Sequence, residues 1–212
     1  AVAIAQLWER GLLKLDDPVA KHIPEFAAGG KEAITIRHLL THTGGFRAVL
    51  GKWEDQPWDE VIAAISAARI EPRWIVGETA GYHPLTSWYI LGELVRRIDG
   101  RPIERFVREM ICQPLEMRDT WMSITPAQYQ SYGQRIGLMH DMRGDKPQVN
   151  FSVETERGMA EPRPGSSMRG PIRELGKFYE MLMRGGTTPE GKKILLPQTV
   201  EAITARQRVG LF

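Results

Sequence analysis

ITIRHLLTHTGGF, residues 34–46, is the stretch of sequence that decides the fold. Its first residues are β-branched and favour an extended backbone, and residues 37–40 then predict a short helical turn. Gly44 and Gly45 end that turn, because glycine adopts backbone angles that other residues avoid. We expect a tight loop at this point, in which His42 either faces a ligand or hydrogen-bonds the loop's own backbone. Its two threonine neighbours favour the second interpretation.

Helical patterns surround this loop on both sides. Apolar residues recur at helical spacing, and glycine or proline residues punctuate the ends. The predicted helices are residues 1–10, 59–68, 86–99, 102–115 and 171–184. The residues expected to face inward on the last of them are Leu175, Phe178, Tyr179 and Leu182. With short strands predicted over residues 134–141 and 147–154, the chain reads as one mostly helical body.

Composition and charge exclude several classes of protein. The 212 residues are 42% hydrophobic and 25% charged, which is typical of a globular domain. A net charge of +2, with scattered basic residues, argues against a nucleic-acid partner. No apolar run approaches the roughly 18 residues that a membrane span needs, and no signal-peptide pattern is visible. Cys112 is the only cysteine, so an internal disulfide is excluded and a reducing compartment is compatible with the sequence. Because no signal peptide is visible, the cytoplasm is slightly preferred.

Both ends of the sequence are abrupt. Ala1 opens directly into an apolar helix without an N-cap residue, and the last two residues are apolar. We therefore expect a chain cut at both ends. Such a cut would leave apolar helix faces partly uncovered over residues 2–8 and 175–182, which predicts self-association into a homo-oligomer or completion by another chain.

A resemblance to a known family rests on several blocks that occur in order along the chain. The blocks are QLWERGLLKLDDPVAKHIPEF (6–26), ITIRHLLTHTGGF (34–46), WIVGETAGYHP (74–84), SWYILGELVRRIDGRP (87–102), REMICQPLEMRDTWM (108–122) and RPGSSMRGPIRELGKFYEMLMRGG (163–186). They resemble the β-lactamase-related serine hydrolases, which include class C β-lactamases, D-Ala-D-Ala peptidases and family VIII esterases. The resemblance implies an α+β fold of the β-lactamase/transpeptidase type, of which this chain holds mostly the helical region while much of the antiparallel sheet is missing.

The resemblance places the family's nucleophile outside residues 1–212. In the family, serine and lysine stand as Ser-x-x-Lys, and the resemblance puts them about seven and about four residues before Ala1. None of the chain's own serines has a lysine three positions on. The third family motif, a Lys-Thr-Gly or His-x-Gly strand, would follow after Phe212. Residues 1–212 are thus expected to be a partial domain that lacks both motifs and is inactive by itself.

The family's second motif falls on Gly81-Tyr82-His83-Pro84. The resemblance implies that Tyr82 is the catalytic general base, which needs a cationic neighbour such as the missing lysine because a phenol titrates near pH 10. Pro84 stands where many members have asparagine, which weakens the case for β-lactam or peptide hydrolysis more than the case for ester hydrolysis. His83 is a substrate-binding or proton-transfer candidate, because its ordinary pKa lies near neutrality.

Other candidate residues have simpler interpretations beside the functional ones. Ser166 and Ser167, in a loop before the last predicted helix, either contact substrate or satisfy backbone amides of a turn. Tryptophans could line an apolar acyl pocket, although most aromatic residues at helical spacing form core. These are Trp53, Trp58, Trp74, Trp88 and Trp121. Asp16-Asp17 more plausibly caps a turn, and His140-Asp141 lacks a spaced partner for a metal, so neither a metal site nor a cofactor is expected.

Two hypotheses follow from these residues. In the first, the parent protein is a serine hydrolase that forms an acyl-serine intermediate and acts on a small-molecule ester or a β-lactam, with the ester preferred. In the second, the chain is a non-catalytic remnant of that fold that binds a ligand or a partner.

Overall fold

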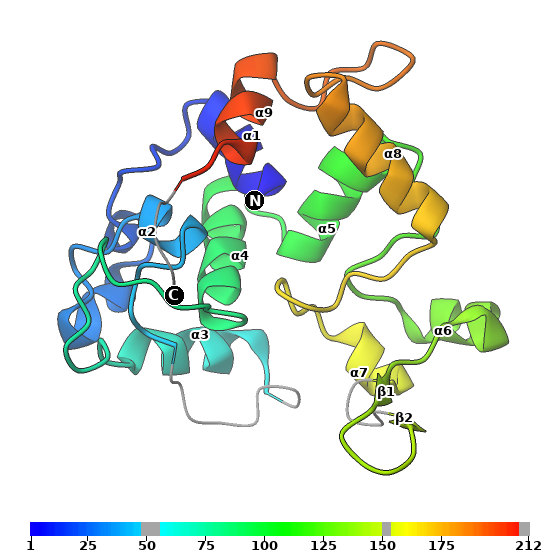
Figure 1. Ribbon diagram of the computed structural model, residues 1–212, viewed down its shortest axis with the longest axis horizontal. Coiled ribbons are helices and arrows are strands. Elements are labelled where there is room, and N and C mark those ends of the chain that lie inside the picture. The colour runs from blue at the N-terminus through cyan, green and yellow to red at the C-terminus, as the bar shows by residue number, and fades with distance from the viewer. Residues whose placement is uncertain (48–55, 150–153, 208–212) are drawn as a thin grey trace.

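The computed structural model describes residues 1–47, 56–149 and 154–207, and their architecture is mostly helical (Figure 1). The α-helices are α1 (Val2–Glu9), α2 (Ile36–Leu40), α3 (Trp58–Ala67), α4 (Thr86–Asp99), α5 (Ile103–Val107), α6 (Pro126–Tyr132), α7 (Glu156–Ala160), α8 (Ile172–Met183) and α9 (Pro197–Thr204). The named strands in these ranges, β1 (His140–Asp141) and β2 (Gln148–Val149), pair in antiparallel register with His140 opposite Val149. No helix among the described residues is long and apolar enough to cross a membrane.

Helix α4 is the centre of the packing. It contacts α1, α2, α3 and α5 (Figure 1), and its inner residues Ile90, Leu94 and Val95 are fully buried. The sequence places apolar residues at helical spacing along it, so one face can be covered by several neighbours. Gly100 ends the helix with a φ of 87°, as the glycine at this position predicts.

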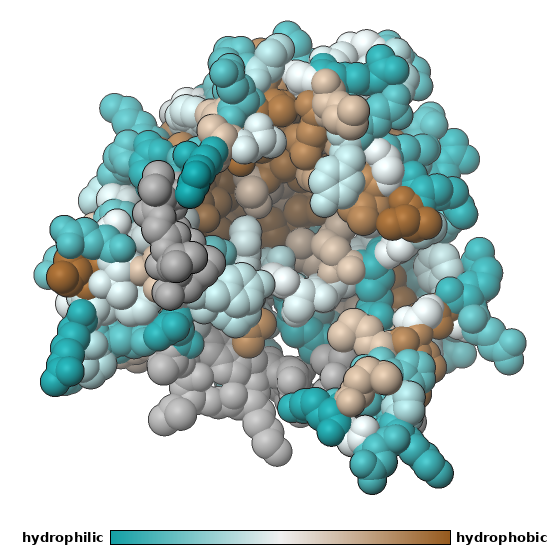
Figure 2. Space-filling model, viewed as in Figure 1, coloured by the Kyte–Doolittle hydropathy of each residue, from teal (hydrophilic) through white to brown (hydrophobic). Residues whose placement is uncertain are grey.

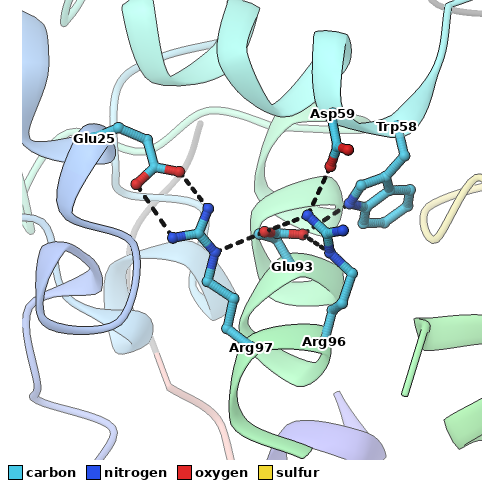
Figure 3. A network of polar contacts seen from close by, with 6 residues as sticks. All are labelled: Glu25, Trp58, Asp59, Glu93, Arg96 and Arg97. Carbon is cyan, nitrogen blue, oxygen red and sulfur yellow. Dashed lines mark hydrogen bonds and ion pairs between the residues drawn. The ribbon is translucent and has the colours of Figure 1, made fainter. Parts of the chain in front are cut away.

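A buried carboxylate holds α4 to its surroundings. Glu93 is 0% exposed, and its oxygens accept hydrogen bonds from Trp58 Nε1 at 2.8 Å, Arg96 Nε at 2.7 Å and Arg97 Nε at 2.7 Å. Arg96 also pairs with Asp59 of α3, and Arg97 pairs with Glu25 (Figure 3). A buried carboxylate is tolerated only when such partners replace water, and here they tie α4 to α3 and to the segment around Glu25.

We predict that Glu93→Ala lowers the free energy of unfolding by about 3 kcal/mol, because Trp58 and two arginines lose their shared partner. Urea denaturation followed by circular dichroism measures the change. Asp59→Ala is the matched control, since the Asp59 side chain is 77% exposed, and it should cost less than about 1 kcal/mol. Equal losses for the two variants would show that Glu93 has no special place in the fold.

A second buried charge closes the C-terminal end of α3. Lys31 is 0% exposed, and its Nζ donates to the carbonyl oxygens of Ala28, Ser66 and Ala68. The last carbonyls of a helix have no partner within the helix, so an ammonium with three N–H groups suits this position. The ammonium also lies 5.2 Å from the ring centre of Phe26.

The two apolar helix faces expected to be partly uncovered, residues 2–8 and 175–182, differ in how far they are buried. Residues Val2–Leu7 of α1 are buried against α4 and α9, so the expectation that this helix is uncovered is wrong. On α8 the expected partly uncovered face is present at Leu175 and Tyr179, whose exposed fractions are 43% and 57%, so these two side chains do not face inward within the described residues. The helix instead buries Met181 and Glu174. Glu174 is held inward because its carboxylate accepts hydrogen bonds from Thr120 Oγ1 at 2.6 Å and from the backbone N–H of Asp119.

An apolar hollow lies between these helices. Figure 2 shows hydrophobic surface gathered there, and the cavity of about 430 Å³ is lined from α1, α4, α5 and α8. Ile4, Leu91, Val107 and Phe178 are among its walls. Helix α8 lines this hollow with Leu175 and Phe178, and it also exposes Ile172 and Met183, at 81% and 88%.

Residues 123–160 depart most from the sequence-based expectation. Helix α6 has no counterpart among the predicted helices, although Thr125 and Gln128 form a capping box and Pro126 follows at the first turn, a pattern that signals a helix start. The strand expected over 134–141 is reduced to His140–Asp141. Of the strand expected over 147–154, Gln148–Val149 is present, while residues 150–153 lie outside the described residues.

Candidate active site

His83 joins the two loops that carry most of the candidate residues. It is 0% exposed, and its Nε2 accepts hydrogen bonds from the backbone N–H groups of Gly45 at 3.0 Å and Phe46 at 3.4 Å. Because Nε2 accepts, the ring proton sits on Nδ1 and donates to the Gly81 carbonyl at 2.5 Å. Both ring nitrogens are therefore used within the chain. The expectation that His83 binds substrate is corrected on this ground, since a fully buried and doubly bonded imidazole offers nothing to a ligand.

Burial also decides the charge of His83. Removal from water lowers its pKa from 6.5 to about 4, because the charged form loses its hydration. His83 is therefore neutral at physiological pH, which keeps Nε2 available as an acceptor.

We predict that stability falls as the pH drops from about 6.5 to about 4, because in that window the unfolded chain binds a proton at His83 and the folded chain does not. Below pH 4 both states are protonated there, and above pH 6.5 neither is. His83→Gln should reduce this slope in urea titrations measured at several pH values. His22 and His38, whose pKa values burial also lowers, keep part of it.

The control for this titration is His140→Leu, because His140 lies in the exposed β1–β2 hairpin. That variant should keep the slope of the unaltered protein. A slope unchanged by His83→Gln would contradict the assignment of a neutral, buried imidazole.

Tyr82 and His42 lie together next to the buried imidazole of His83, and the His42 ring stacks on it with ring centres 5.9 Å apart. The Tyr82 side chain is 60% exposed, and its ring centre is 5.1 Å from that of His42. His42 adopts a φ of 59°, and its Nδ1 accepts from the backbone N–H of His83 at 3.2 Å. The loop-bonding interpretation of His42 therefore describes one of its nitrogens, while the ring also faces Tyr82 and stands 6.1 Å from Trp88. The structure thus brings Tyr82, His42 and Trp88 into one cluster.

Glycine permits the third loop, residues 163–170, to approach this cluster. A β-carbon at Gly165 would lie 2.3 Å from the Pro84 carbonyl oxygen and 2.9 Å from Trp88 Cδ1, so only glycine fits. Ser166 follows it and is exposed. Ser167 is buried, and its Oγ accepts from Arg163 N at 2.8 Å and donates to Arg163 O at 3.0 Å. The turn interpretation therefore holds for Ser167, whose substrate-binding role is corrected, while Ser166 remains at the surface beside Tyr82's loop.

The tryptophans divide among several environments. Trp88 belongs to the Tyr82 cluster, and Trp74 packs on Gly45 with its Nε1 donating to Thr43 O at 3.1 Å. Trp58 serves the Glu93 network, and Trp121 donates to the Tyr132 hydroxyl at 2.9 Å in a separate cavity. Trp53 lies outside the described residues. The described tryptophans therefore do not form a common acyl pocket.

The remaining acidic candidates have local partners. Asp16 pairs with Arg37 at 2.7 Å, and Asp17 accepts from the backbone N–H of Lys14 at 2.9 Å, as a turn-capping carboxylate does. His140 and Asp141 lie in the hairpin, where Asp141 pairs with Arg143. Within residues 1–47, 56–149 and 154–207, no three metal-binding side chains come together.

Comparison with known proteins identifies the family to which this chain belongs. The family model described as Beta-lactamase matches residues 1–211, so the chain belongs to the β-lactamase family. Its relatives include both esterases and penicillin-binding-protein-like proteins, which confirms the resemblance and the β-lactamase/transpeptidase-like α+β fold.

Particular relatives show how far the similarity reaches. The esterase/β-lactamase LipL of Mycobacterium tuberculosis is 30% identical over 98% of this chain and 53% of its own length. The esterase EstB of Burkholderia gladioli is 32% identical over 56% of this chain and 34% of its own length. The chain therefore spans about half or less of the curated relatives it matches.

Solved structures agree on the fold. A penicillin-binding protein homologue from Caulobacter crescentus superposes with a TM-score of 0.76 at 28% identity, over 99% of this chain and 59% of its own. A family VIII carboxylesterase superposes with a TM-score of 0.80 at 24% identity, over 94% of this chain and 56% of its own.

Proposed function

We propose that the protein to which this chain belongs is a serine hydrolase that cleaves small-molecule carboxylic esters through an acyl-serine intermediate, with Tyr82 as its proton relay. The observation that carries the proposal is the exposed Tyr82 side chain, held by a loop that the neutral His83 anchors. Tyr82 has His42 beside it, His42 in turn faces Trp88, and the Gly165 loop lies against the loop of Tyr82. The site therefore presents a phenol at the surface on a rigid support, which a general base requires.

The chemistry needs a nucleophile that residues 1–212 do not supply. No serine of this sequence has lysine three residues later, so we propose that the 212-residue chain alone does not turn over esters. The proposal requires that the encoding gene specifies Ser-x-x-Lys upstream of Ala1. In that protein the lysine would accept the serine proton, and Tyr82 would hold or return it during acylation. The carbonyl carbon of the ester then gains the serine oxygen, the alcohol leaves with a proton, and water releases the acid.

Esters are preferred to β-lactams because of Pro84. Its carbonyl oxygen contacts Gly165, and its ring carries no amide to hold a lactam or peptide. An acyl-serine on an ester needs a nucleophile, a base and an oxyanion site more than it needs that amide. The relative EstB, which is named an esterase, favours the same choice, whereas LipL is named both an esterase and a β-lactamase.

We predict that Tyr82→Phe lowers kcat for p-nitrophenyl butyrate by about 10²–10⁴-fold in the gene product that carries Ser-x-x-Lys, because the proton relay is lost. KM should change little, since the phenyl ring remains. Tyr179→Phe is the matched control, because Tyr179 is 57% exposed on α8 away from the cluster, and it should leave kcat unchanged. Turnover by the 212-residue chain alone, or full activity of Tyr82→Phe, would defeat the proposal.

The alternative is a non-catalytic remnant that binds a ligand or partner. The sequence of the same gene upstream of Ala1 distinguishes this alternative from ester hydrolysis. Absence of Ser-x-x-Lys upstream of Ala1 would favour it over hydrolysis.

We also propose that the 212-residue chain self-associates, because α8 exposes Ile172, Leu175 and Met183 next to the apolar hollow. Light scattering at micromolar concentration should give a mass of at least two copies of 24.0 kDa. Ile172→Glu and Met183→Glu together should shift the mass towards one copy. A monomer with a cooperative melt in the unaltered chain would overturn this proposal.

A further inference from the structure

A second cavity, of about 570 Å³, opens beside the loop that carries Ser166. Its walls come from the segment after α5, from α6, from α7 and from residues 163–173. Four of its described lining residues are arginines, namely Arg135, Arg163, Arg169 and Arg173, whereas a single one, Asp119, is acidic. An arginine side chain stays protonated at any pH at which the protein is folded, so this cavity carries an excess of positive charge.

Two of the four arginines are already compensated. Arg169 Nη2 pairs with Glu154 Oε1 at 2.6 Å, and Glu154 is buried without lining the cavity. Arg173 lies 3.5 Å from Asp119 Oδ2, whose other oxygen accepts from the Tyr132 hydroxyl at 2.9 Å. Both Asp119 oxygens and one Glu154 oxygen are therefore engaged, while Glu154 Oε2 is buried without a hydrogen-bond partner among the described residues.

Arg163 and Arg135 have no carboxylate partner in the described part of the chain. Arg163 is 7% exposed, its Nη2 donates to the Gly158 carbonyl at 2.5 Å, and its Nη1 is buried without a hydrogen-bond partner among the described residues. Arg135 is exposed and lies 5.0 Å from the ring centre of Tyr132. A buried N–H of a charged group without a partner costs free energy, which an incoming anion would recover.

The remaining walls are largely apolar. Trp121, Ile124, Met139 and Met159 contribute side chains to the same cavity. A ligand that fits must therefore combine an apolar body with a negative end, which excludes inorganic anions and neutral apolar molecules as the best occupants.

We propose that this cavity binds the carboxylate end of a small acidic molecule with an apolar body, and that Arg163 and Arg135 hold the carboxylate. The turn 163–167 borders the Tyr82 loop through Gly165 and borders this cavity through Arg163 and Ser166. If the bound molecule is the substrate, the proposal rests on the proposed ester hydrolysis, and the cavity then selects esters that carry a carboxylate. The binding itself requires no turnover.

The test compares 3-phenylpropionate with its neutral isostere 3-phenylpropanamide on the 212-residue chain. Binding is followed by an NMR titration of the Trp121 indole N–H, which lies at the cavity wall. The carboxylate should bind at least tenfold more tightly than the amide, and the difference should shrink at high salt. Equal affinities, or no saturable shift with either compound, would overturn the proposal.

Two variants separate recognition from folding. Arg135→Gln alters an exposed side chain and should weaken 3-phenylpropionate binding several-fold without changing the melting temperature. Arg163→Met keeps much of the length of the side chain and removes its charge, and it should abolish the preference for the carboxylate. Arg143→Gln is the control, because Arg143 is 91% exposed in the hairpin and is not part of the cavity wall, and it should bind as the unaltered chain does. Since no turnover is measured, failure of this binding test leaves ester hydrolysis standing, and failure of hydrolysis leaves this site standing.

Discussion

The hydrogen-bonded carboxylate of Glu93 is the constraint on which the rest of the structure depends. It sits within α4, the helix that packs against α1, α2, α3 and α5, and it draws Trp58, Arg96 and Arg97 to one point (Figure 3). Because a buried carboxylate must keep its donors, these hydrogen bonds hold α4 against α3 and the segment around Glu25. With α4 fixed in rotation, the loop that enters it, residues 81–85, has a defined direction. The loop that carries Tyr82 is therefore joined directly to the helix that these hydrogen bonds hold in place.

Much of the helical fold can be predicted from the sequence. The helix over 86–99 and its glycine stop follow from spacing alone, because a long amphipathic pattern leaves little choice. The inward face of α8 cannot be found in that way. Its Leu175 and Tyr179 satisfy the helical period, but the side of a helix that is buried depends on which neighbours reach it, and Glu174 is drawn inward by the Asp119 amide and the Thr120 hydroxyl. Long-range hydrogen bonds of this kind leave no local trace in a sequence.

The candidate site shows the same division. The motif points to Tyr82, and its place beside His42 follows from two loops that meet at His83, whose backbone N–H donates to His42, 41 residues earlier in the sequence. The role expected of His83 is wrong because a histidine near neutrality suggests proton transfer, whereas burial removes the charge and turns the ring into a bridge. The cavity lined by arginines escapes sequence reasoning because its members are spread from residue 119 to residue 173 with no common spacing. The sequence signal for this cavity is the proline- and glycine-rich loop next to Ser166 and Ser167. It indicates where the cavity lies but not which other residues line it.

Gly165 approaches the Pro84 carbonyl so closely that a β-carbon at residue 165 would lie 2.3 Å from the carbonyl oxygen, so the two loops meet here backbone to backbone. Side chains change rotamer on fast timescales, and each change adds positional noise to a site that is assembled from their tips. A spacer made of two backbones has no such degree of freedom. The separation between the Tyr82 loop and the Ser166 loop is thereby insulated from thermal rotamer exchange, and it varies only as fast as the loops themselves can bend.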